Sequence, residues 1–315
     1  MTTDAHRASP RGAGSLGTLR RGEVRAAWGF SLPALALLTA FLIVPFVLAF
    51  VLAFTDQRLI PNPRLPTEFV GLRNFQRILE DPSFQRALMN NFAFAAFVVP
   101  VQSMLALGMA MLVNQKLRGS LVFRTIYFSP VVTTMVVVSA IWFLLYNPDE
   151  GFINAFLGAI SFGTIPAIRW LQDPRTALIA IGILSVWQGV GFQMVIFLAG
   201  LQEIPEQLYD AARIDGADRR QTFWNITLPS LRNTTIFVVI STTILAFRLY
   251  DQVKIMTGGG PQDATQTVVF QIERVGFSQL RVGYASALTV VFFVIVLAVA
   301  LLQRRFLREE RTVRE

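Results

Sequence analysis

The sequence predicts an all-α membrane protein with six transmembrane helices. Two observations on composition support this class: 53% of the 315 residues are hydrophobic and only 15% are charged. A soluble chain carries about 25% charged residues. The third observation is that the apolar residues gather in uncharged runs, and a membrane-spanning helix needs roughly 20 residues of this kind.

Five uncharged runs are long enough to cross a bilayer, at residues 28–54, 90–115, 125–147, 176–202 and 282–303. A sixth run begins at Asn233 and is interrupted by Arg248. We extend it to residue 253 by letting Arg248 face the bundle interior or reach the membrane interface. The expected organisation is a basic tail over residues 1–27, a membrane domain over residues 28–303 and a second basic tail over residues 304–315.

The distribution of Lys and Arg predicts the orientation of these spans. The two tails, the connection between the second and third spans and the loop at residues 203–232 hold 17 Lys and Arg, against 10 on the opposite side. The positive-inside rule therefore places both termini and this loop in the cytoplasm. The first apolar run is 27 residues long and lacks a small-residue cleavage site, so we expect a retained span and not a signal peptide.

The residue types present exclude several kinds of site. Cys is absent, and the single His is His6 in the N-terminal tail. Thiolate metal sites, a His-based catalytic triad and a histidine zinc site are therefore excluded. The chain has no Walker A sequence and no kinase-type glycine loop, so we expect no enzyme activity and no cofactor in this chain. The net charge of +8 reflects the excess of Lys and Arg on one side of the membrane and does not indicate nucleic acid binding.

The polar segment IPEQLYDAARIDGADRRQTFWNITLP, residues 204–229, has its own helix signals. Pro205 suits a first helical position, and Gly216 suits a helix C-cap. These signals predict a helix from Pro205 to Asp215 and a second short helix over residues 217–226. A loop that only joins two spans needs a handful of polar residues. This longer segment, with its own helix signals, is typical of a helix that binds another protein.

This segment resembles the cytoplasmic coupling loop of binding-protein-dependent ABC import permeases, with its E-A-A…G…I-x-L-P motif. The matching residues are Asp210, Ala211, Ala212, Gly216, Ile226, Leu228 and Pro229. The first acid is Asp where the family has Glu, and the surrounding residues look like the first permease subunit of the carbohydrate-import, maltose-type branch. The resemblance implies a type I importer permease in the bacterial inner membrane.

The resemblance also implies partners. They are a second permease, a dimer of ATP-binding subunits that would bind ATP and Mg²⁺, and an extracytoplasmic substrate-binding protein. The implied contacts with the ATP-binding subunit are Glu206, Leu208, Tyr209, Asp210, Ala211, Ala212, Asp215 and Gly216. Asp210 would pair with the partner, Gly216 would permit a left-handed turn, and Leu208, Ile214 and Phe223 would pack the loop onto its own bundle.

Polar and aromatic side chains of the fourth and fifth spans are the candidates for the substrate path, because a buried polar group in lipid is costly and usually functional. The candidates are Ser185, Trp187, Gln188, Phe192, Thr242, Thr243 and Tyr250. Two other roles remain open. Trp187 and Tyr250 would serve in helix packing or at the membrane interface, and the Ser and Thr hydroxyls would donate hydrogen bonds to the backbone of their own helix. Arg248 and Asp251, three apart on a helix, would neutralise each other.

Three segments lie on the opposite side of the membrane in this topology. Residues 55–89 contain a G-L-x-N-F sequence that resembles a family feature and leads into a short amphipathic helix with Phe75, Ile78 and Leu79 on one face. Residues 148–175 are expected to form a loop with Trp170 as an interfacial anchor. The sequence TGGGP at residues 257–261 resembles a turn that places the next segment against the binding protein.

These features together predict the membrane subunit of an ATP-driven importer for a sugar or oligosaccharide. The alternative is the same machinery carrying glycerol-phosphate, a polyol or a glycoside. An ion-coupled secondary transporter would call for intramembrane carboxylates, and the five long uncharged runs contain no Asp or Glu. A receptor or scaffold would not require the loop at residues 204–229.

Overall fold

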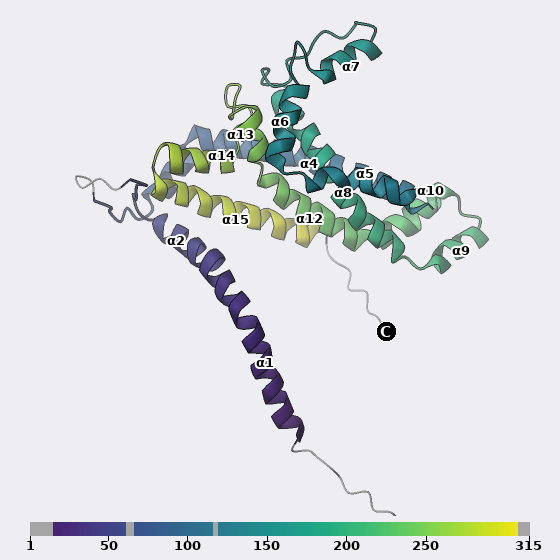
Figure 1. The fold of residues 1–315 in the computed structure, drawn as a ribbon, viewed down its shortest axis with the longest axis horizontal. Helices are drawn as coiled ribbons and strands as arrows, with labels where there is room; N and C mark the ends of the chain where they lie inside the picture. Colours follow the sequence, from purple (N-terminus) through teal and green to yellow (C-terminus); the bar gives the residue numbers. More distant parts are fainter. Residues whose placement is uncertain (1–14, 61–65, 116–118, 308–315) are drawn as a thin grey trace, which may run out of the picture.

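The structure is a computed structural model that describes residues 15–60, 66–115 and 119–307. Within these ranges the chain is helical apart from turns, extended connections and an isolated β-bridge between Thr55 and Phe69. The expected all-α class is confirmed. Figure 1 shows the long helices after residue 80 lying together in one bundle, and α4 (Pro82–Asn114) and α8 (Ala177–Gln202) form its most extensive contact.

Five helical stretches are long and apolar enough to cross a membrane, at Glu23–Leu52, Pro82–Asn114, Ala177–Gln202, Arg232–Met256 and Val282–Phe306. The first comprises α1 (Ser15–Leu38), the π-helix η1 (Thr39–Ile43) and α2 (Val44–Leu52). The last two comprise α12 (Arg232–Phe247) with α13 (Asp251–Met256), and α15 (Val282–Leu307). These stretches correspond to five of the six expected spans.

The third expected span is not one continuous helix. It consists of α5 (Ser120–Val132) and α6 (Met135–Leu145), which are bent by 98° at a short break. The break follows Pro130 and a run of four β-branched residues, Val131 to Thr134, and both features disfavour a continuing helix. Thr133 and Thr134 are accordingly extended. The chain has six spans if this bent pair counts as one.

The fifth span is also interrupted, at residues 248–250. α12 ends at Phe247 and α13 begins at Asp251, so the carbonyl groups at the break lose their helical partners. Two buried side chains replace them. The amide of Asn91 donates to the Phe247 carbonyl at 3.2 Å, and the Thr267 hydroxyl donates to the Leu249 carbonyl at 2.8 Å. Irregular backbone at membrane depth requires this kind of internal compensation.

Asn91 is fully buried and also accepts a hydrogen bond from the Val268 backbone N–H at 2.9 Å. We expect Asn91→Leu to lower the free energy of unfolding, because it leaves one buried carbonyl and one buried N–H unpaired, at about 1–3 kcal/mol for each group. Thermal unfolding of the purified protein in detergent measures this loss. Asn114→Leu, at the exposed end of the same helix, should change the midpoint little, and an equal loss in both variants would contradict the role of Asn91.

Two of the three segments expected on the outer side, residues 55–89 and 254–281, meet at one end of the bundle. The Leu59 N–H donates to the Leu280 carbonyl at 2.9 Å, and the Asn90 amide donates to the Asp263 carbonyl at 3.0 Å. This end carries α3 (Arg73–Glu80), α14 (Val268–Glu273) and the π-helix η3 (Arg274–Ser278). The 203–231 loop lies at the opposite end (Figure 1).

Helix α3 confirms the expected short amphipathic helix but not its apolar face. Ile78 is fully buried and Phe75 is partly buried, whereas Leu79 is 74% exposed. Asn74 takes the third buried position, because its amide donates to the carbonyl groups of Ala53 and Thr55 at 2.9 and 2.8 Å. A polar residue therefore completes the buried face, and Leu79 points outward.

Residues 148–175 differ from the expected loop, because they contain the helix α7 (Phe152–Ile160). Asn154 of this helix fastens the following segment: its amide donates to the Ile168 carbonyl at 2.9 Å, and its oxygen accepts from the Trp170 indole at 2.9 Å. Trp170 is thereby held against the protein and packs on the ring of Tyr146. Trp170 therefore has a packing role within the protein, and its role as an interfacial anchor stays a prediction.

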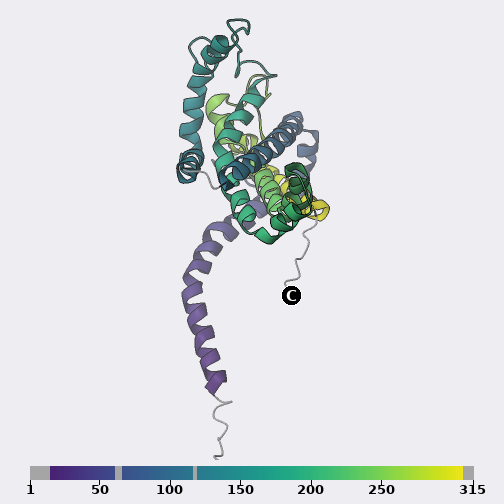
Figure 2. The ribbon, with the colours of Figure 1, turned by 90° about the vertical axis from the view of Figure 1, so that its right-hand side faces the viewer.

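The first span stands apart from the bundle. No residue of its most apolar window is buried, and Figures 1 and 2 show α1 leaving the other helices at an angle. Only its last part packs on the chain, where Phe46 of α2 meets Phe293 of α15 with ring centroids 5.1 Å apart. The core that positions the candidate site is therefore built by the later helices.

Candidate functional site

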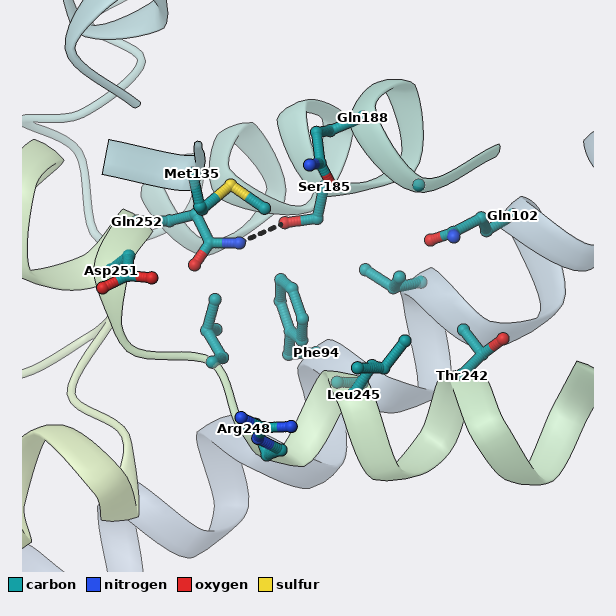
Figure 3. A pocket seen from close by; sticks show the side chains of 14 residues that line it. Phe94, Gln102, Met135, Ser185, Gln188, Thr242, Leu245, Arg248, Asp251 and Gln252 are labelled. Atoms are coloured by element: carbon teal, nitrogen blue, oxygen red, sulfur yellow. Dashed lines mark hydrogen bonds between the residues drawn. The ribbon is translucent and has the colours of Figure 1, made fainter. Parts of the chain in front are cut away.

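A polar cavity of about 270 Å³ lies where the fifth span is broken. Its walls come from α4, α6, α8 and the α12–α13 break, as Figure 3 shows. The side chains that bring polar atoms to it are Gln102, Ser185, Gln188, Thr242, Arg248, Asp251 and Gln252. Phe94 and Met135 add an aromatic ring and a thioether. Amides, a hydroxyl and one aromatic ring suit a polyhydroxylated solute, which needs both hydrogen bonds and an apolar contact.

The amides of Gln102 and Gln188 make no hydrogen bond to the described part of the chain, so both are free for a solute. The Gln102 amide packs against Gly189, where a Cβ would lie 2.3 Å from its nitrogen, so a side chain at position 189 would displace the amide from its present position. On the other side, Gln252 of α13 donates to the Ser185 hydroxyl of α8 at 3.3 Å, the dashed line in Figure 3. This hydrogen bond links the short helix beyond the break to α8.

Three of the predicted substrate-path residues line this cavity: Ser185, Gln188 and Thr242. Thr242 donates to the Val238 carbonyl at 2.6 Å and accepts from the Gln193 amide, so its hydroxyl is occupied within the protein. Ser185 likewise donates to the Ile181 carbonyl of its own helix at 2.8 Å. Gln188 is therefore the predicted residue with the most freedom to bind a solute.

The other four predicted residues do not line it. Trp187 and Phe192 are each 44% exposed, and Trp187 borders a separate, mostly apolar cavity between α4, α5 and α8. Thr243 is buried and accepts from the Gln303 amide at 2.9 Å. Tyr250 lies in the break itself. These residues diverge because neighbouring positions on one helix face different directions.

Gln102 and Gln252 are not among the residues predicted from the sequence, because that prediction rests on the fourth span and on the fifth span up to Asp251. Gln102 was detectable in principle, since it is a polar residue in the middle of the second uncharged run. The neutralisation expected for Arg248 and Asp251 is wrong in its premise, because the helix is interrupted between them. Both line the cavity, and within the described ranges they form no ion pair.

At the far end of the bundle, the 203–231 loop forms the helix α9 (Glu206–Ile214). Its end matches the prediction at Gly216, which has φ +76°. The Gly216 N–H donates to the Arg213 carbonyl at 3.2 Å and the Ala217 N–H to the Ala212 carbonyl at 2.9 Å. This pair of hydrogen bonds is the Schellman motif, which requires a left-handed residue at the turn.

Two contacts attach α9 to its own loop. Ala212 is buried, and the Tyr209 hydroxyl lies 3.2 Å from the Thr227 hydroxyl. The expected packing of Leu208 and Ile214 onto the bundle is wrong, since these side chains are 44% and 86% exposed. Ala212 and Tyr209, three positions apart, share the inward face. Leu208 and Ile214 lie one and two positions from them, and such positions face other directions on a helix.

The outward face of α9 carries Glu206, Leu208, Asp210 and Ala211, with Asp215 and Gly216 exposed at its end. Asp210 accepts from Arg213 at 3.0 Å, and both side chains are largely exposed. An exposed ion pair of this kind contributes only about 0–1 kcal/mol. The Asp210 carboxylate is therefore free to exchange Arg213 for another partner.

A second helical stretch follows, as predicted. Asp218 and Gln221 form a reciprocal capping box at the start of α10 (Arg219–Thr222). The chain continues through the π-helix η2 (Phe223–Thr227) and the single turn α11 (Leu228–Ser230) into α12. The loop is thus a series of short helices between two spans.

Residues 85–312 match the family described as "Binding-protein-dependent transport system inner membrane component". The chain belongs to this family. It is therefore a multi-pass inner membrane permease and not the ATP-hydrolysing subunit. The matched segment contains both the cavity and the 203–231 loop, so both lie within the family's own domain and not in an appended one.

Individual relatives agree with this assignment. The chain is 33% identical over 284 residues to the trehalose/maltose transport system permease protein MalF of Thermococcus litoralis, covering 89% of this chain and 92% of the relative. It is 32% identical over 284 residues to the sn-glycerol-3-phosphate transport system permease protein UgpA of Yersinia enterocolitica, covering 90% and 93%.

A solved structure confirms the permease fold. The chain superimposes on a chain of a bacterial ABC transporter involved in the import of the acidic polysaccharide alginate, with a TM-score of 0.78 and 20% identity. The match covers 95% of this chain and 99% of that one. The bent third span and the isolated first span are therefore compatible with the fold of an importer permease.

Proposed function

We propose that this permease forms the translocation path of an ATP-driven ABC importer for a sugar or oligosaccharide, together with a second permease. Relatives named for trehalose/maltose and for sn-glycerol-3-phosphate support the importer and leave two classes of cargo. The observation that favours a sugar is the cavity at the broken fifth span. Its lining offers the two free neutral amides of Gln102 and Gln188, and its charged groups are a single cation, Arg248, and a single anion, Asp251.

Charge distinguishes the two classes of cargo. A phosphate monoester carries close to two negative charges at neutral pH and binds best where cations outnumber anions. The cavity lining has one of each, so it offers no net positive charge. A neutral sugar needs hydrogen-bonding groups and a ring surface, and Gln102, Gln188 and Phe94 supply both.

Uptake by whole cells tests this proposal. Removing the gene for this chain should abolish uptake of at least one labelled disaccharide or oligosaccharide and leave uptake of labelled sn-glycerol-3-phosphate unchanged. Restoring the gene should restore sugar uptake. Loss of glycerol-phosphate uptake with every sugar still imported would favour the alternative cargo and refute the sugar assignment.

Replacement of Gln188 by Ala tests whether the cavity touches the cargo. We expect Gln188→Ala to reduce the uptake rate at low sugar concentration by about fivefold, the effect of one lost hydrogen bond of about 1 kcal/mol. Gln76→Ala, on the exposed surface of α3, is the matched control and should transport normally. Unchanged uptake by Gln188→Ala would place the cargo elsewhere.

We further propose that α9 is the coupling helix, which receives movement from a dimer of ATP-binding subunits. The exposed Leu208, Ala211 and Ile214 form an apolar strip on its outward face, and the strip is flanked by charges that a partner groove can pair. The partner dimer would bind ATP and Mg²⁺, and an extracytoplasmic binding protein would deliver the sugar. A similar chain from a bacterial alginate ABC transporter, solved in complex with an alginate pentasaccharide-bound periplasmic protein, supports such an assembly.

The proposed coupling role of α9 implies an orientation of the chain in the membrane. The coupling loop, both basic tails and residues 116–124 would lie in the cytoplasm, with the membrane domain over residues 28–303. The 17 to 10 excess of Lys and Arg on that side supports this orientation. The hydrogen bonds that join residues 55–60 to residues 280–283 at the other end of the bundle support a common outer side for these segments.

A further inference from the structure

A second polar pocket lies at the outer end of the bundle, away from the cavity and from the coupling loop. It has a volume of about 390 Å³ and is formed where the end of α3, the start of α4, the α14–η3 segment and the start of α15 meet. Its charged and aromatic lining consists of Arg77, Glu80, Asp81, Arg274, Arg281 and Tyr284. We call it the outer basic pocket.

The three guanidinium groups of this pocket are not neutralised within the described chain. Neither Arg77, Arg274 nor Arg281 takes part in an ion pair there. Arg77 and Arg281 instead lie over the ring of Tyr284, 5.1 and 5.6 Å from its centroid. Burial, together with the nearby charges of Arg77 and Arg58, lowers the pKa of Arg281. The pocket therefore holds an excess of positive charge, which an anion would relieve.

Asp81 and Glu80 offset two of the three positive charges, so the pocket lining keeps a net charge of +1. The Asp81 carboxylate is also engaged in hydrogen bonds within the protein. It accepts from the Ser83 N–H at 2.9 Å, from the Gln271 amide at 3.1 Å and from the Tyr284 hydroxyl at 2.9 Å. Asp81 thus ties α4, α14 and α15 together. Its role is to hold the pocket's walls in place.

The pocket also contains acceptors that lack a donor. Gln271 is 1% exposed and its side-chain oxygen has no hydrogen-bond partner in the described chain. The Glu80 side chain is exposed and forms no ion pair with any described residue. A ligand with a phosphate for the arginines and an adjoining ammonium or hydroxyl for Glu80 and Gln271 would satisfy both sets of groups.

The elements that form this pocket also carry exposed apolar side chains. Leu79, two positions after Arg77, is 74% exposed, and Phe277, three positions after Arg274, is 67% exposed. A short amphipathic helix that combines basic and apolar exposed residues is typical of the membrane interface. A phospholipid is a ligand that combines a phosphate, a headgroup with hydrogen-bond donors and hydrocarbon chains in one molecule.

We propose that the outer basic pocket binds the headgroup of a membrane phospholipid, with the phosphate on Arg77, Arg274 and Arg281 and the acyl chains along Leu79 and Phe277. This site is separate from the transport cavity and does not depend on which solute is carried. A lipid there would bridge α3, α14 and α15 at the point where the outer segments join.

Native mass spectrometry of the full-length protein in detergent, with added phosphatidylethanolamine, tests the proposal. The double variant Arg77→Gln/Arg281→Gln should retain this lipid at least about tenfold less well than the unchanged protein, since it loses charge-assisted hydrogen bonds to the phosphate. The matched control is Arg73→Gln, on the same helix but outside the pocket, and it should retain lipid normally.

Two further arms separate a lipid from a free anion. Leu79→Ser/Phe277→Ser leaves every guanidinium in place, so it should lose lipid while its thermal midpoint shows that it remains folded. Inorganic phosphate at millimolar concentration should not displace bound lipid. Equal lipid retention by the arginine variant and its control, or displacement of lipid by inorganic phosphate alone, would overturn the proposal.

Discussion

Gly216→Pro should leave the permease inserted in the membrane and abolish transport. Gly216 has φ +76°, whereas the proline ring fixes φ near −65°, and proline has no N–H to donate to the Arg213 carbonyl. The Schellman turn that ends α9 cannot form in this variant. A proline in such a position costs about 3 kcal/mol or more, which is roughly a hundredfold shift against the native loop.

The control for this variant is Gly216→Asn. Asn adopts the left-handed region more readily than most residues, and a Cβ at position 216 meets no described atom within 4 Å. We therefore expect Gly216→Asn to retain most sugar uptake while Gly216→Pro loses it, with equal amounts of both proteins in the membrane. Normal uptake by the proline variant would refute the coupling role of α9.

Gly191→Leu should destabilise the bundle strongly. A Cβ on Gly191 would lie 1.9 Å from the Tyr127 carbonyl oxygen and 3.1 Å from the Phe128 Cα. These are backbone atoms, so no side-chain rotation relieves the clash, and α5 must move away from α8. Overpacking in a core costs about 1–3 kcal/mol even where side chains adjust, and we expect a loss at or above the upper end.

The thermal midpoint of the purified protein in detergent, followed by size-exclusion chromatography, measures this effect. Gly108→Leu is the matched control, because Gly108 lies within α4 and a Cβ there meets no described atom within 4 Å. Gly191→Ala should show a smaller loss than Gly191→Leu. If Gly108→Leu and Gly191→Leu had the same midpoint, the close contact of α5 and α8 would not be a determinant of stability.

The two variants separate stability from coupling. Gly216→Pro alters an exposed turn at the end of α9, so the helices around the cavity should stay assembled. Gly191→Leu separates α5 from α8, and α8 carries Ser185 and Gln188 at the cavity. Sugar uptake should therefore fail in both variants, but only Gly191→Leu should also lose thermal stability.

Local signals in the chain are sufficient to predict the all-α class, the approximate positions of five spans and the short helices of the 203–231 loop. The length of an uncharged run and a left-handed turn at Gly216 each depend on residues that are contiguous in the chain. Such signals can be interpreted without knowledge of the fold, because the contacts they describe form within one or two helical turns.

Which polar residues meet depends on packing between distant segments. Ser185 and Trp187 are two positions apart on α8, yet one lines the cavity and the other borders a separate apolar one, because packing against neighbours sets the rotation of a helix about its axis. The Gln102 amide takes its place in the cavity wall against Gly189, a residue of another helix. The break after Phe247 is likewise held by Asn91 and Thr267, which the fold brings together from segments remote in sequence.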